Sequence, residues 1–144
     1  MMRKVLCSVV FFLFLSTNAL AQTKQVEIFD IEKGKVVQLV PTSSEIQKEA
    51  STFLQGISGV YTKVRPIPEK GYMIKFPLEP SIMVDNQWFK GLVDEVVIIF
   101  PEQEKPFLMV FDDENRLHFY HFDGNTDRFL NLLHFQPQNG TGPN

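Results

Sequence analysis

The chain's single cysteine, Cys7, lies within an N-terminal segment that has the pattern of an export signal. If residues 1–21 are removed, the working protein contains no cysteine. Such a domain can form no disulfide, offers no thiolate nucleophile and supplies no thiolate ligand to a metal. An exported domain of this size must then be held together by its hydrophobic core.

The N-terminal segment follows the order of positive charge, apolar core and small residues that defines a cleavable signal peptide. Two basic residues precede a nearly unbroken apolar run over 5–15. Small side chains at Ala19 and Ala21 occupy the positions that a signal peptidase reads, so we predict cleavage between Ala21 and Gln22. A membrane-spanning helix needs about 20 apolar residues, roughly twice what this run offers. The alternative is an uncleaved segment that anchors the protein.

The composition of the remaining chain narrows the class of protein. Cleavage leaves 123 of the 144 residues, the usual size of one domain. Twelve basic residues then stand against seventeen acidic ones, a net charge of about −5. This charge argues against a nucleic-acid-binding protein, because there is no basic face to neutralise phosphates, and it discourages adsorption to anionic membranes. Residues 136–144 are predicted to form a flexible tail, which leaves 22–135 as a single domain.

The first half of the domain combines a hairpin with one helix. Strand-forming runs at 26–31 and 35–40 flank a short loop that contains glycine, the pattern of an antiparallel hairpin. Thr42 and Glu45 stand at the positions of a capping box, so a helix should begin there. The helix should end near Gly56. Its apolar positions recur at helical spacing: Ile46, Ala50, Phe53, Leu54 and Ile57.

Strands dominate the rest of the domain. Runs at 60–64 and 72–76 predict two of them, and Pro77 and Pro80 indicate a loop afterwards. The strongest strand patterns follow in three segments: 93–100, 107–111 and 117–122. Their linkers are short and polar, as expected of hairpins. A short amphipathic helix should end the domain over 126–133.

Together these patterns predict an α+β fold. It consists of an N-terminal β-hairpin, one main amphipathic helix packed on an antiparallel sheet of about five to seven strands, and a short C-terminal helix. No sequence motif identifies a family.

His118, Tyr120 and His121 form the cluster with the most versatile chemistry. Histidine can bind a metal or shuttle protons near neutral pH. Within a strand, however, His118 and His121 point to opposite faces, so they cannot hold one ion as neighbours. We expect one histidine at a sheet edge or pocket rim, where a pH-sensing or acid–base role is the alternative to a structural one.

Trp88 lies beside Phe89 in a polar segment ahead of the most apolar strand. Aromatic side chains on loops anchor a partner or ligand when they are exposed and close the core when they are buried. We expect Phe89 to belong to the core. Both roles stay open for Trp88.

The acidic run at 112–114 is the remaining candidate for a metal site or for paired carboxylates. It occupies the predicted turn between two strands, where acidic residues are ordinary, so we expect a solvated turn. The sequence therefore predicts no catalytic residue, no metal ligand and no cofactor. The possible binding residues are Trp88, His118, Tyr120 and His121.

A non-catalytic binding or interaction domain is the function that these observations favour, secreted or otherwise extracytoplasmic. The expected partner is a protein or a cell-envelope component, and neither nucleic acid nor, after cleavage, a membrane span is expected. The alternative is a small-molecule carrier or a cofactorless enzyme. It would need an apolar pocket between helix and sheet, with Tyr120 and a histidine at its rim.

Overall fold

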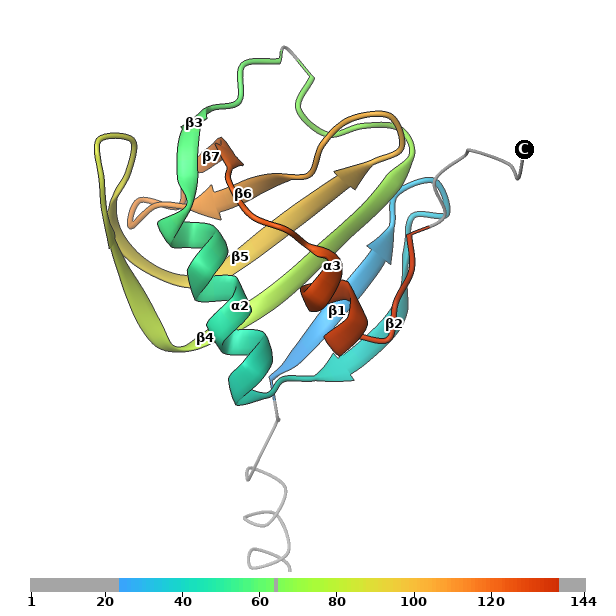
Figure 1. Ribbon diagram of the computed structural model, residues 1–144. Coiled ribbons are helices and arrows are strands. Elements are labelled where there is room, and N and C mark those ends of the chain that lie inside the picture. The colour runs from blue at the N-terminus through green and yellow to red at the C-terminus, as the bar shows by residue number, and fades with distance from the viewer. Residues whose placement is uncertain (1–23, 64, 138–144) are drawn as a thin grey trace, which may run out of the picture.

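A seven-stranded antiparallel sheet runs through the computed structural model, which describes residues 24–63 and 65–137. The strands are β1 (Gln25–Asp30), β2 (Lys35–Pro41), β3 (Ile57–Val60), β4 (Gly71–Asp85), β5 (Lys90–Pro101), β6 (Phe107–Phe111) and β7 (Leu117–Phe122). They lie side by side in the order β2-β1-β4-β5-β6-β7-β3. Helices α2 (Ser44–Gln55) and α3 (Asp127–Leu132) both lie on one face of this sheet (Figure 1). The predicted α+β class is confirmed.

Both ends of the chain extend beyond this description. The predicted signal peptide, with its cleavage position between Ala21 and Gln22, lies outside the described residues, as does most of the predicted tail. These two predictions stay predictions. Within the described residues, no helix combines the length and the apolar character needed to cross a membrane.

The N-terminal hairpin is formed by β1 and β2, and its turn is fixed by Asp30 and Gly34. The Asp30 carboxylate accepts a hydrogen bond from the Lys33 N–H at 3.0 Å, and the Gly34 N–H donates to the Asp30 carbonyl at 2.8 Å. Gly34 has a φ of 66°, a conformation that glycine adopts without steric cost. Beyond the turn the ladder shifts register after Ile28, and β2 forms one edge of the sheet.

Helix α2 is capped one residue later than the sequence predicts. Ser43 is the N-cap, because its extended backbone directs the hydroxyl at the Ile46 N–H, which donates to it at 3.2 Å. The predicted cap, Thr42, instead accepts a hydrogen bond from the Gln47 side-chain amide at 2.8 Å. The predicted capping box is therefore wrong, whereas the end of the helix at Gly56 is confirmed.

Strand β3 lies earlier than the predicted strand over 60–64. Ile57 follows the end of α2 directly and pairs with Phe122 of β7, so the strand is already complete at Val60. This pairing crosses a long stretch of sequence, and no local pattern indicates it.

Strand β4 is longer than predicted, because it continues through Pro77 and Pro80 instead of ending in a loop. Proline has no N–H to donate to a ladder. The β4–β5 ladder accommodates both prolines in an irregular stretch, where its register shifts between Pro77 and Ile82. Regular pairing then resumes and carries the hairpin out to its tip.

The main core lies between the helices and the sheet. Phe129 of α3 is fully buried and joins the two layers, with its ring centroid 5.5 Å from that of Phe53 on α2 and 5.3 Å from that of Phe76 on β4. The Gln38 side-chain amide of β2 donates to the Leu133 carbonyl at 3.1 Å and ties the C-terminal end of α3 to the sheet edge.

A second, smaller hydrophobic cluster occupies the face of the sheet away from the helices. It comprises Val97, Ile99, Phe107 and Met109. Tyr61 covers part of it by stacking on Phe107, with ring centroids 3.9 Å apart and planes within 8°. The central strands β5 and β6 are thus apolar on both faces, which explains their unbroken apolar sequences.

Candidate functional site

Trp88 lies at the tip of the β4–β5 hairpin, in a turn whose main chain is fixed by Asn86. The Asn86 side-chain oxygen accepts hydrogen bonds from the backbone N–H groups of Trp88 and Phe89, at 2.8 and 2.9 Å. The Asn86 N–H in turn donates to the Phe89 carbonyl at 3.0 Å. Asparagine suits this position because its side chain can bond to the backbone two and three residues ahead.

Phe89 fastens this turn to the body of the domain. Its side chain is buried, and its ring lies edge-on to those of His118 and Tyr120 on β7, with centroids 5.9 and 6.1 Å away. The expectation that Phe89 belongs to the core is confirmed. The hairpin tip is therefore held by packing as well as by its own hydrogen bonds.

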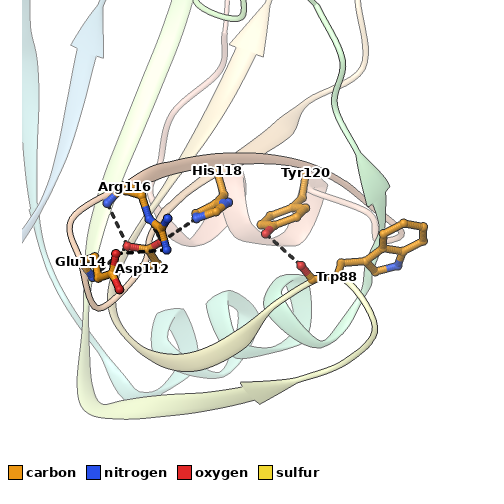
Figure 2. A network of polar contacts seen from close by, with 6 residues as sticks. All are labelled: Trp88, Asp112, Glu114, Arg116, His118 and Tyr120. Atoms are coloured by element: carbon orange, nitrogen blue, oxygen red, sulfur yellow. Dashed lines mark hydrogen bonds and ion pairs between the residues drawn. The ribbon is translucent and has the colours of Figure 1, made fainter.

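Tyr120 adds a direct polar contact to the turn. Its hydroxyl donates to the Trp88 carbonyl at 3.2 Å. Burial raises the pKa of Tyr120, and the nearby charge of Asp112 raises it further, so the hydroxyl keeps its proton and remains a donor at neutral pH. Figure 2 shows the Trp88 indole pointing away from Tyr120 and His118, and Trp88 keeps 39% of its surface exposed.

Asp112 organises the neighbouring β6–β7 turn. Its carboxylate accepts hydrogen bonds from the Glu114 N–H at 2.8 Å, from the Arg116 N–H at 2.9 Å and from Arg116 Nε at 3.0 Å (Figure 2). His118 Nε2 lies 2.8 Å from the same carboxylate. The side chain is only 15% exposed, so Asp112 is a structural centre of the turn. Asp113 and Glu114 are exposed, as the expected solvated turn requires.

These contacts determine the ionisation of Asp112. The hydrogen bond with His118 is the largest cause, followed by the backbone N–H of Arg116, and together they hold the pKa of this carboxyl well below its usual range. Hydrogen bonds to the charged form stabilise it, so Asp112 is a carboxylate at neutral pH. The sequence shows that Asp112 can begin a turn but not that His118 returns to it across the hairpin.

The lowered pKa of Asp112 predicts a pH-dependent stability. A depressed pKa stabilises the fold fully above about pH 5, and this contribution is lost as the pH falls toward the lowered pKa. We expect Asp112→Asn to lower the urea midpoint more at pH 7 than at pH 3, because at pH 3 the unfolded chain is already largely protonated at this position while the folded carboxylate is not. Asp113→Asn, at the exposed neighbour, is the matched control and should show no such difference. Equal losses for Asp112→Asn at both pH values would contradict the assignment.

His121 does not belong to this cluster. It lies on the other face of β7, where its ring meets that of Tyr61 edge-on at a centroid distance of 5.1 Å. The structure therefore brings together Trp88, His118 and Tyr120 from the candidates and adds Asn86, Phe89 and Asp112. In the described ranges, no three ligand-type side chains gather where a metal ion could be held.

Two of the hollows in the described part of the chain are well formed, and neither is lined by Trp88, His118 or Tyr120. One, of about 360 Å³, lies between the segment after β3 and the β5–β6 turn. The other, of about 260 Å³, lies on the sheet face away from the helices. The alternative function required an apolar pocket between helix and sheet with Tyr120 at its rim. Neither of these hollows is such a pocket, so this part of the alternative stays a prediction.

The polar contacts of this cluster hold the loop at the hairpin tip in a fixed position. Each polar contact described above either closes a turn or joins the hairpin tip to β7, and the indole is the group left facing outward. No protein family model, curated protein or solved structure matches this chain.

Proposed function

We propose that this protein is an exported, non-catalytic binding domain that holds a protein partner through Trp88. The observation that supports it most is an exposed indole on a turn whose backbone is already fixed. Binding to a turn whose backbone is already ordered loses less conformational entropy, and tryptophan is enriched among the residues that dominate interface energies. The export part of the proposal rests on the N-terminal sequence pattern.

The arrangement around Trp88 supports binding rather than a core role for this residue. Phe89 points inward and supplies the hydrophobic anchor of the turn, while the adjacent Trp88 points outward. The printed hydrogen bonds fix the Trp88 backbone, and 39% of the residue stays exposed. An outward-facing aromatic side chain on a fixed turn is suited to contact with a partner.

Trp88 is also the chain's only tryptophan, so its fluorescence reports on this site alone. We expect a partner recovered from cell-envelope extract to shift the emission to shorter wavelength and to protect the indole from acrylamide quenching. Trp88→Ala should weaken binding at least about 30-fold, the loss expected for a residue that dominates an interface. Trp88→Phe, which keeps an aromatic ring, should lose less.

Ile67→Ala is the matched control, because Ile67 is an exposed apolar residue between Pro66 and Pro68, which lie beside the end of the β4–β5 hairpin away from its tip. It should bind the partner as the unmodified domain does. Equal recovery of the partner by Trp88→Ala and by the unmodified domain would overturn the assignment of Trp88 as the anchor.

A further inference from the structure

The sheet face away from the helices carries an apolar hollow that no described helix covers. The hollow has a volume of about 260 Å³, and its apolar lining comes from five neighbouring strands: Phe29, Val36, Met73, Val97, Met109 and Phe111. We call this surface, together with its flanking residues on β2 and β7, the open face. Tyr61 covers only the adjoining part around Phe107. Exposed apolar surface of this kind marks an interaction site in soluble proteins.

Projecting apolar side chains stand on both sides of the hollow. Leu39 on β2 lies opposite Glu27, which lines the hollow, and is 55% exposed. Leu117 on β7 lies opposite Phe111, which also lines it, and is 48% exposed. The open face therefore carries both an apolar recess and projecting apolar side chains.

The dimensions favour a protein surface over a small ligand as the occupant. The hollow is smaller than the roughly 300 Å³ at which small-molecule pockets begin. In contrast, the open face crosses six strands from β2 to β7, about 24 Å at the usual strand spacing. A standard protein interface of about 800 Å² per partner is of similar width.

The charges at the rim favour a partner that carries both signs. Lys75 pairs with Glu27, its neighbour on the adjacent strand β1, at 3.2 Å, whereas Glu95 has no ion-pair partner within the described ranges. A surface that offers one lysine and two glutamates can be matched by another of the same composition, with each Lys75 placed against the Glu95 of the other copy. A purely basic partner would instead leave Lys75 opposed by like charge.

We propose that two copies of this chain pair through their open faces about a two-fold axis. In a two-fold interface, a residue that projects from one copy meets the recess of the other, and the reverse contact follows by symmetry. Leu117 of each copy then enters the hollow of its partner, and the sheets pack face to face. The dimer would display two Trp88 side chains, so partners with repeated sites would bind more tightly than single sites allow.

Sedimentation of the chain from Gln22 to Asn144, which contains every described residue, tests this pairing. We expect a dimer whose population rises with concentration. Leu117→Glu should raise the dimer dissociation constant at least about 30-fold, because a carboxylate would enter an apolar recess. Val60→Glu is the matched control and should dimerise normally. Val60 is similarly exposed, at 49%, but lies opposite Tyr120 and so points to the helix side.

A second and more specific experiment exchanges the charges that face each other in the proposed dimer. Lys75→Glu and Glu95→Lys should each weaken the homodimer, while an equimolar mixture of the two variants should form a heterodimer more tightly than either variant pairs with itself. Trp88→Ala should leave the dimer intact, so this proposal and the proposed function fail separately. Circular dichroism checks that each variant is folded, as expected for substitutions at the protein surface.

Three outcomes would overturn the proposal. The first is a monomer up to about 1 mM, where even an association of about 4 kcal/mol would be half complete. The second is equal weakening by Leu117→Glu and Val60→Glu. The third is a monomer whose open face binds an apolar dye and loses it in Leu117→Glu, which would assign the face to a different occupant.

Discussion

Phe129→Ala is expected to lower the free energy of unfolding by about 3–5 kcal/mol. The Phe129 ring is fully buried and contacts Phe53 of α2 and Phe76 of β4, so the substitution opens a cavity where two helices and the sheet meet. A domain of this size is stable by only about 5–15 kcal/mol, so much of its stability depends on this contact. The midpoint of urea unfolding at pH 7 measures the loss.

Leu92→Ala is the control for this prediction. Leu92 is an apolar residue on β5 that is half exposed, and its truncation should change stability by no more than about 0.5 kcal/mol. If Phe129→Ala cost no more than Leu92→Ala, α3 would not be packed against α2 and β4 as described. A small loss for Phe129→Ala with a reduced unfolding slope would instead indicate that α3 detaches separately from the sheet.

The class of fold could be predicted because the strongest sequence patterns follow burial closely. The apolar run of β5 alternates between the two hydrophobic clusters, with Ile98 facing the helices and Val97 facing away. Helical spacing likewise identified the buried side of α2. In each case the pattern is local, since both burial and period are properties of neighbouring residues.

The errors in the fold prediction arise where distant pairing overrides local preference. Pro77 and Pro80 indicate a break when read alone, but β5 pairs with β4 on both sides of them and holds one long strand together. The cap at Ser43 in place of Thr42 reflects a choice between two similar hydroxyl groups, which the path of the chain out of β2 decides. Neither the continuation of β4 nor the choice of helix cap can be predicted from the neighbouring residues alone.

Three of the four candidate residues meet in the structure, whereas His121 lies apart and Asn86 was not among the candidates. Trp88, His118 and Tyr120 stand out by side-chain chemistry alone. The hydrogen bond from Tyr120 to the Trp88 carbonyl joins residues 32 positions apart, and the Asp112–His118 contact closes across a turn. Such contacts depend on how the β4–β5 hairpin folds back toward β7, which is a property of the assembled sheet.

Gly71→Ala is expected to destabilise the protein by about 2–5 kcal/mol, through backbone strain and steric overlap together. Gly71 begins β4 with a φ of 126°, a conformation that L-residues rarely adopt. An added Cβ would also overlap the carbonyl oxygen of Phe100 on the paired strand β5, which belongs to rigid backbone and cannot move aside. The shift of the urea midpoint at pH 7 measures the effect.

Substitutions at two other glycines allow the effects of backbone strain and of steric overlap to be measured separately. Gly34 also has a positive φ but has open space around it, so Gly34→Ala should cost only the backbone term, about 1–2 kcal/mol. Gly59 has neither feature, so Gly59→Ala should change stability by no more than about 0.5 kcal/mol. Gly71→Ala must be the most costly of the three, because it alone adds the overlap with Phe100. Equal losses for Gly71→Ala and Gly34→Ala would show that β4 and β5 do not approach as closely as described.

The same two strands carry the hairpin tip. Trp88 emission in Gly71→Ala should therefore match the unmodified protein until unfolding begins and then change together with the loss of the sheet.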